Sequence, residues 1–386
     1  MPSVLTDHVK SDRIVRDTFQ LVSTPSPTGD TREVAALYER LLQDAGCKVE
    51  RFDLINNNPT LVATFGGDLP GKTIIFNGHM DTVTIDHEPA AIREGRIYGR
   101  GACDMKGSLA CILEVLRVLK DSETKLHGKI VIIANSLHES PGGRGEDLIA
   151  LAEKMKLSAD VAIVMEGATT ECTVAQFGSA TFEITIRREG EPSHQLYTPP
   201  GTANPIHVAS DIIQLLRELN VELEKDYVED IGYASYFIGS VHSGQFYNQH
   251  PKEAQIVGVR RYSPQTTFED VDKELRTHLD RIAAEHGVEV ILDLVKVRDG
   301  YRLDKSNPAV EVLVQAIQNV RGIQVPLVGK KLVTDAGIIA NDFATPALCH
   351  GPDQRSAHGD VEFVEISELE WTTKVYLEFI DAYMKD

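Results

Sequence analysis

The chain has 386 residues, of which 42% are hydrophobic and 25% are charged. This is the composition of a globular protein, and the length favours two domains over one small core. The net charge is −19 and no dense run of lysine or arginine interrupts it, so a nucleic-acid backbone or an anionic membrane would be repelled by most of the surface. We therefore expect neither nucleic acid nor a membrane as a partner.

The N-terminal segment and the cysteines indicate the compartment. The opening MPSVLTDHVKSDRIVRDTF carries charges where a signal peptide needs an apolar core, and no apolar run approaches the ~20 residues of a membrane span. The five cysteines are scattered and form no CxxC, which argues against a disulfide framework and against a thiolate zinc site. We expect a soluble, cytoplasmic protein in which any bound metal has histidine and carboxylate ligands.

The first part of the chain alternates between predicted helices and strands. A capping region around residues 28–31 precedes an amphipathic helix that stops at Gly46, and KTIIFNGHMDTV follows as a strand. A Gly-rich turn then leads into the helical pattern of GSLACILEVLRVLKD, after which GKIVIIANS is a strand, GEDLIALAEKM a helix and ADVAIVMEG a strand. This rhythm predicts an α/β sheet covered by helices.

From about residue 175 the pattern becomes that of a compact α+β module. QFGSATFEITIRREG alternates as an antiparallel strand does, and two predicted helices, GTANPIHVASDIIQLLREL and FEDVDKELRTHLDRIAAEHG, flank a further pair of strands. After about residue 294 the α/β rhythm returns. We therefore predict one domain formed by residues 1–174 and 294–386, with residues 175–293 inserted into it.

Chemically active side chains occur where predicted strands end. His79, Glu139 and Glu166 each follow an apolar strand, and open α/β sheets bind ligands at the carboxyl ends of their strands. His79 and Asp81 are two residues apart in NGHMDTV, so on a strand they face the same side, as in a metal-binding histidine oriented by a carboxylate. Taken singly, each of these residues is explained equally well as a solvated surface group.

Asp104 and His358 are ambiguous when they are considered alone. Asp104 lies between a Gly-rich turn and a helix, where helix capping fully explains an aspartate. His358 in GPDQRSAHGDVEFV lies in a predicted loop, where histidine is usually solvated. The order of the five residues along the chain carries the information that each lacks by itself.

Five motifs together resemble the aminoacylase and carboxypeptidase superfamily of co-catalytic metallohydrolases, which includes acetylornithine deacetylase and succinyl-diaminopimelate desuccinylase. They are NGHMDTV, GRGACDMKGSLA, HESPGGRGEDLI, VMEGA and GPDQRSAHGDVEF. The resemblance covers about residues 10–385. It implies a zinc-exopeptidase-like catalytic α/β domain with an inserted ferredoxin-like α+β dimerisation domain, and hence a homodimer or higher homo-oligomer formed through residues 175–293.

The resemblance also implies a centre of one or two divalent metal ions. Asp104 would bridge two ions. One ion would also be held by His79 and Glu166. The other would be held by Glu139 and His358. Zinc is the first expectation for such nitrogen and oxygen ligands, with manganese or cobalt as alternatives.

Further residues complete the implied site. Asp81 would orient His79. His194 in REGEPSHQLYTPPGTANP matches the superfamily's histidine that reaches across the dimer to stabilise the oxyanion, and Asn248 in FYNQHP matches an asparagine near the same place. Arg260 in GVRRYSP, or its neighbour, matches an arginine that engages a substrate acid. Solvated loop and strand positions are the alternative explanations of His194 and Arg260.

Two positions depart from the superfamily pattern. Its hydrolases carry a glutamate as general base directly before the metal-binding glutamate, and here that position is His138. Three interpretations stay open: His138 is the base, it joins the metal shell, or hydrolysis has been lost. As a base it must be neutral, which nearby dications favour. The segment VTDAGII also lacks the arginine with which members clamp a substrate carboxylate.

These features predict a divalent-metal-dependent hydrolase of a C–N bond, most directly an amide of a small N-acyl or carboxylate-bearing substrate. The metals would supply the attacking hydroxide, His194 would help to stabilise the oxyanion and His138 would carry the proton. Hydrolytic deamination of an aromatic or other non-peptide amine is one alternative, because the base and the clamp are both altered. A non-catalytic metal-binding or ligand-binding protein is the other.

Overall fold

The computed structural model describes residues 3–139 and 142–385. It divides into two compact units, the first formed by Met1–Val174, Arg302–Val328 and Thr334–Asp386, and the second by Ala175–Tyr301 with Gly329–Val333. The sequence analysis ends the inserted domain at residue 293, which lies inside strand β14 (Glu289–Arg298). The second unit thus keeps the whole of that strand, because β14 pairs along β9 of the same unit.

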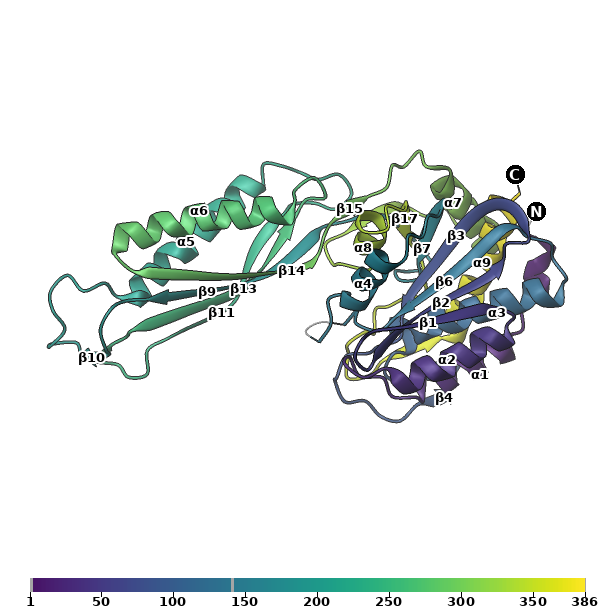
Figure 1. The fold of residues 1–386 in the computed structure, drawn as a ribbon, viewed down its shortest axis with the longest axis horizontal. Coiled ribbons are helices and arrows are strands. Elements are labelled where there is room, and N and C mark those ends of the chain that lie inside the picture. Colours follow the sequence, from purple (N-terminus) through teal and green to yellow (C-terminus); the bar gives the residue numbers. More distant parts are fainter. Residues whose placement is uncertain (1–2, 140–141, 386) are drawn as a thin grey trace. The chain divides into compact units, whose positions relative to one another are not determined.

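The first unit is built on a mixed sheet with the strand order β1-β2-β6-β3-β7-β17-β8-β15, and β16 pairs with β8 (Figure 1). Its strands are β1 (Lys48–Ile55), β2 (Asn58–Gly66), β3 (Leu69–His79), β6 (His127–Asn135), β7 (Val161–Val164), β8 (Cys172–Gln176), β15 (Tyr301–Arg302), β16 (Leu327–Lys330) and β17 (Ala347–Cys349). The four central strands, β6, β3, β7 and β17, run parallel to their neighbours in that set.

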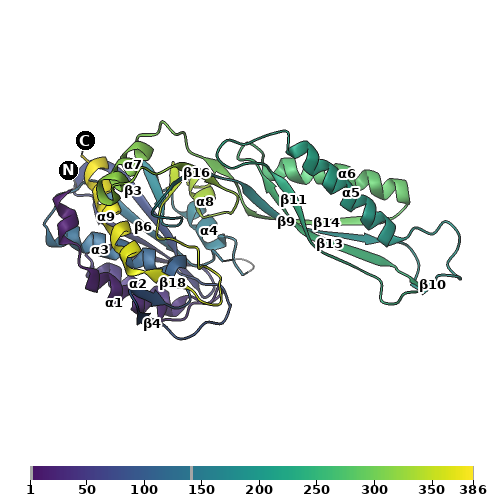
Figure 2. The ribbon, with the colours of Figure 1, turned by 180° about the vertical axis from the view of Figure 1, so that it is seen from behind.

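Helices cover this sheet, as the sequence rhythm predicts. They are α1 (Ser11–Val22), α2 (Arg32–Asp44), α3 (Gly107–Asp121), α4 (Glu146–Lys154), α7 (Pro308–Arg321), α8 (Ala336–Asn341) and α9 (Ile366–Tyr383). Helix α3 is buried from Gly107 to Leu119, with Glu114 and Arg117 among its buried residues, so it is enclosed by other elements on every side. It packs against α1 and α9, and Figure 2 shows α3 and α9 in front of the sheet.

Two short turns of helix and a small sheet complete the first unit. They are η1 (Val4–His8), η2 (Ala102–Lys106) and the strands β4 (Ala91–Arg93), β5 (Arg96–Tyr98) and β18 (Phe363–Glu365). The small sheet has the order β18-β5-β4, and it joins the segment that precedes η2 to the segment that precedes α9.

The central strands are apolar because both faces of a parallel sheet are covered. Residues 74–79, 130–135 and 161–164 are buried in β3, β6 and β7. The register pairs His79 with Asn135 and Asn77 with Val164, so the three strands end at nearly the same level. The first polar side chains after the apolar runs therefore gather at one edge of the sheet.

The second unit is a separate α+β module with its own core. Its antiparallel sheet has the order β11-β13-β9-β14, and its main elements are β9 (Gly178–Arg187), α5 (Pro205–Leu223), β11 (Ser235–Ser243), β13 (Glu253–Tyr262), α6 (Phe268–His286) and β14. This βαββαβ order is that of a ferredoxin-like fold. Alternate β9 residues Phe182, Ile184 and Ile186 pack with residues of α5 and α6. The predicted α/β class with an inserted α+β module is thereby confirmed.

A short strand pair belongs to the second unit. Strand β10 (Ser193–His194) pairs antiparallel with β12 (Gln249–His250). Among the helices within the described ranges, none is long and apolar enough to cross a membrane.

A pair of glycine substitutions tests the register of β3 and β6. Gly128 has a φ of +98°, and a Cβ there would lie 1.9 Å from the carbonyl oxygen of Lys72, its partner in β3. Gly95 has a φ of +73° but a Cβ there would meet nothing within 4 Å. We expect Gly95→Ala to lower the free energy of unfolding by about 1 kcal/mol. Gly128→Ala should lower it by about 3 kcal/mol or more, because backbone must move.

Chemical denaturation of the two variants measures this difference. Equal losses would contradict the described register.

Candidate functional site

The candidate site lies where the parallel strands of the first unit end. His79 is the last residue of β3, and Glu166 follows the last residue of β7 by two positions. Both side chains are buried, and the Nε2 of His79 lies 3.9 Å from Oε1 of Glu166. Residues from two distant motifs thus meet because their strands pair in parallel.

Asp104 occupies the centre of the cluster. Its Oδ1 lies 3.1 Å from Nε2 of His79, and its Oδ2 lies 3.4 Å from Nε2 of His358. The N-cap of the following helix α3 is Lys106, which makes no side-chain capping bond. The alternative that Asp104 caps the helix is therefore wrong, and its two oxygens face histidines that come from separate parts of the chain.

Glu139 and His358 form the other side of the cluster. Oε2 of Glu139 lies 3.1 Å from Nε2 of His358. Glu139 is buried, and the side chain of His358 is 49% exposed, so this side of the cluster is open to solvent. All five predicted metal ligands therefore lie together in the first unit.

The donor set fits divalent cations. Two groups have ligand atoms within 4.8 Å of one another, namely His79, His138 and Glu166, and His79, Asp104 and Glu139. Oε2 of Glu166 is buried without a hydrogen-bond partner among the described residues, and burial raises the pKa of this carboxyl to about 7. A buried carboxylate cluster of this kind is poorly satisfied without a cation, and its nitrogen and oxygen donors suit zinc, manganese or cobalt.

Asp81 ties the cluster to its supporting loops. Its backbone carbonyl oxygen lies within hydrogen-bond distance of Nδ1 of His79, at 3.0 Å, and its carboxylate Oδ1 lies 3.4 Å from the same nitrogen. The same carboxylate accepts hydrogen bonds from the backbone N–H groups of His138 at 3.2 Å and Glu139 at 3.0 Å, and from the hydroxyl of Thr28 at 2.9 Å. Asp81 therefore orients one histidine and fixes the backbone that carries Glu139.

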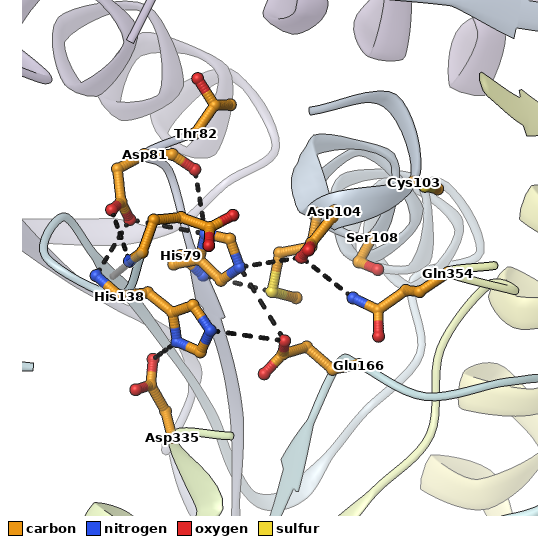
Figure 3. Close-up of polar contacts among 12 residues, drawn as sticks. His79, Asp81, Thr82, Cys103, Asp104, Ser108, His138, Glu166, Asp335 and Gln354 are labelled. Atoms are coloured by element: carbon orange, nitrogen blue, oxygen red, sulfur yellow. Dashed lines mark hydrogen bonds and ion pairs between the residues drawn. The ribbon is translucent and has the colours of Figure 1, made fainter. Parts of the chain in front are cut away.

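His138 lies within the cluster rather than outside it. Its ring stacks on that of His79, with centroids 4.1 Å apart and planes 4° apart. Nδ1 lies 3.1 Å from Oδ2 of Asp335, and Nε2 lies 3.7 Å from Oε1 of Glu166 (Figure 3). Burial opposes the charge of this imidazole, but the neighbouring carboxylates of Asp335 and Glu166 raise its pKa to about 9.

Three polar residues at the site were not identified from the sequence. Asp335 lies beside His138. Gln354 donates from Nε2 to Oδ1 of Asp104 at 3.0 Å and accepts from the N–H of Gly167 at 3.0 Å. Glu362 accepts from the N–H of Asp104 at 3.3 Å. The segments VTDAGII and GPDQRSAHGDVEF, both singled out in the sequence, contain all three.

The remaining predicted residues lie in the second unit. Nδ2 of Asn248, the residue before β12, donates to Nε2 of His194 in β10 at 3.1 Å in an exposed contact. Arg260 is only 3% exposed, so it is not a solvent-facing strand arginine; its guanidinium lies over the ring of Tyr236 and 3.6 Å from the carboxylate of Glu274. The roles of these residues towards a substrate stay predictions.

The sequence has relatives across nearly its full length. One, 26% identical over 93% of this chain and 92% of its own, is an N-formyl-4-amino-5-aminomethyl-2-methylpyrimidine deformylase of Halalkalibacterium halodurans. Another, 26% identical over 98% of both chains, is a succinyl-diaminopimelate desuccinylase of Methylobacterium radiotolerans. The chain is similar to enzymes named for the removal of two different acyl groups.

Solved structures share the fold. The aminopeptidase PepT of Bacillus cereus matches with a TM-score of 0.81 at 21% identity and covers 98% of this chain and 100% of its own. A Bacillus subtilis protein described as a dinuclear metal-binding peptidase of the M20 family matches with a TM-score of 0.70 at 16% identity, covering 97% of this chain and 98% of its own.

Residues 75–382 match the model of peptidase family M20/M25/M40. This span contains all five residues that form the carboxylate and histidine cluster of the first unit. The family resemblance expected from the sequence is confirmed, and with it hydrolysis of amide C–N bonds as the chemistry of the family. The chain belongs to peptidase family M20/M25/M40.

Proposed function

We propose that the protein is a divalent-metal-dependent hydrolase that cleaves the amide C–N bond of a small N-acyl or carboxylate-bearing substrate. One observation carries this proposal: three carboxylates and two histidines from five separated motifs converge at one edge of the sheet, and Oε2 of Glu166, one of these carboxylates, is buried without a hydrogen-bond partner among the described residues. The family match supports the same chemistry.

Asp104 would lie between two ions, zinc in the first instance, because each of its oxygens faces a different histidine. His79 and Glu166 would complete one site. Glu139 and His358 would complete the other. Bound ions of this type polarise a carbonyl group and lower the pKa of water, which makes hydrolysis accessible at neutral pH.

We propose that His138 acts as the base rather than as a metal ligand. Its ring is stacked on that of His79, with the planes 4° apart, and its Nδ1 faces Asp335 while its Nε2 faces Glu166. His79 would hold an ion, and His138 would take the proton from the water that the metal activates.

In this scheme the protein's own residues orient groups and carry the proton. Nε2 of His138 accepts a proton from the attacking water and delivers it to the leaving nitrogen. Asp81 keeps His79 in place through Nδ1. From the second unit, His194 stabilises the oxyanion across a homodimer, with Asn248 as its hydrogen-bond partner.

We also propose a homodimer formed through the second unit, and a cytoplasmic location. The proposed role of His194 requires a dimer, because His194 would act on the active site of the partner subunit. All five cysteines lie among the described residues and are buried without a disulfide, as is usual in a reducing compartment.

The metal ligands can be tested by metal analysis. We expect purified protein dialysed against zinc to retain tightly bound ions, and His79→Ala or Glu166→Ala to weaken zinc affinity on the order of 100-fold or more, because each removes a direct ligand. His127→Ala, at the exposed start of β6, is the matched control. Retention of wild-type zinc content by both ligand variants in chelator competition would show that the ions bind elsewhere.

The reaction class can be tested with a panel of N-formyl amines, N-succinyl amines and free aryl amines. We expect release of formate or succinate by the zinc-loaded enzyme, loss of turnover on chelation, and recovery when metal is restored. Ammonia release from aryl amines alone would establish the deamination alternative. Full metal occupancy without turnover on any member of a broad panel would favour a binding protein.

A further inference from the structure

Asp335 is a buried carboxylate beside the proposed base. It lies immediately before α8, is 1% exposed, and places Oδ2 3.1 Å from Nδ1 of His138. It belongs to neither of the groups whose ligand atoms converge for a metal ion. Its position therefore calls for an explanation other than metal binding, and it lies beside the imidazole of His138.

A chain of buried amides fixes the orientation of Asp335. Nδ2 of Asn77 donates to the carbonyl oxygen of Ile133 at 3.2 Å and to Oδ1 of Asn135 at 2.9 Å. Nδ2 of Asn135 then donates to Oδ2 of Asp335 at 2.7 Å. Both ends of this chain are pure acceptors, a carbonyl and a carboxylate, so each amide can lie only one way round. The carboxylate oxygen near His138 is consequently held by β3 and β6.

The same oxygen faces Nδ1 of His138. An ionised carboxylate only accepts hydrogen bonds, so in a neutral His138 the nitrogen that faces it is the one that the carboxylate favours for the proton. The contact is at ion-pair distance, and the N–H is not aligned as a full hydrogen bond. The stack on His79 limits rotation of the ring, which leaves Nε2 on the side of Glu166 at 3.7 Å.

We propose that Asp335 is a positioning residue that holds His138 as the Nδ1–H tautomer and so keeps Nε2 available as the proton acceptor. This inference rests on the proposed function and deepens it. The oxygen of water bonds to the acyl carbon while its proton passes to Nε2. The C–N bond then breaks and that proton moves to the leaving nitrogen, so the Nδ1 proton stays on the ring throughout and the products are an acid and an amine.

A histidine base has a requirement that a glutamate base lacks. A carboxylate accepts a proton at either oxygen, whereas a neutral imidazole accepts one only at the nitrogen that is unprotonated. A histidine at this position therefore needs a partner that selects the tautomer, and Asp335 supplies it.

Asp335→Leu removes the acceptor at similar volume and tests the proposal by kinetics. We expect kcat on the best acyl amide to fall about 100-fold, with KM within about threefold and zinc content unchanged. In a His138→Gln background the same substitution should lower kcat little further, because Asp335 acts through His138. Equal losses of kcat in both backgrounds, or a loss of zinc that accounts for the whole effect, would overturn the inference.

The tautomer can be read without turnover. In zinc-loaded protein labelled with 15N-histidine, the His138 signals, assigned by their absence in His138→Gln, should show a protonated Nδ1 and an unprotonated Nε2. Asp335→Leu should shift them towards a mixture. An unchanged tautomer in Asp335→Leu would contradict the proposal, even for an enzyme whose substrate proves not to be an acyl amide, so the two proposals fail separately.

Asp335→Asn provides a second variant that preserves the fold more closely. Its side-chain oxygen can still accept from Asn135 and from Nδ1, but without the negative charge. We expect the Nδ1–H tautomer to persist and kcat to fall less than in Asp335→Leu. A mixed tautomer in Asp335→Asn, or a greater loss of kcat than with leucine, would contradict the proposal.

Discussion

Parallel pairing of β3 with β6 and β7 is the constraint on which the site depends. It makes three buried apolar strands end level, so that side chains far apart in the sequence emerge at the same edge. Two further elements complete the cluster: η2, which carries Asp104, and the segment before β18, which carries His358. Asp104 contacts both His79 at the end of β3 and His358. Gln354 bonds both to Asp104 and to the backbone of Gly167, which joins two of these elements directly.

Charge at this edge is concentrated, and imidazoles lie between the carboxylates. Carboxylates at such density are costly in a buried setting unless cations or hydrogen bonds compensate them. The supporting network of Asp81, Asn135 and Asp335 uses donors from the backbone and from amides. The outer layer of the site is thus hydrogen-bonded throughout these three residues, whereas Oε2 of Glu166 has no hydrogen-bond partner among the described residues.

The sequence predicted the α/β rhythm, the inserted module and the five clustered residues, because each rests on local periodicity or on a motif in a fixed order. It did not predict the contact of Asp335 with His138, because this contact depends on where α8 begins in space relative to the end of β6, and no local sequence pattern specifies that. The helix-cap explanation of Asp104 was wrong because the irregular turn η2 moves the start of α3 to Gly107. The predicted end of the inserted domain, residue 293, fell inside β14, because the residue pattern of a strand does not show which sheet the strand joins.

The way in which Asp81 holds the loop has a consequence for how such an enzyme changes. Asp81 bonds to the backbone N–H groups of His138 and Glu139 and not to the side chain at position 138. These two hydrogen bonds hold the backbone at positions 138 and 139 without using the side chain at 138. A substitution at position 138 that leaves both N–H groups in place would therefore keep Glu139 where it is, whatever the chemistry of the new side chain.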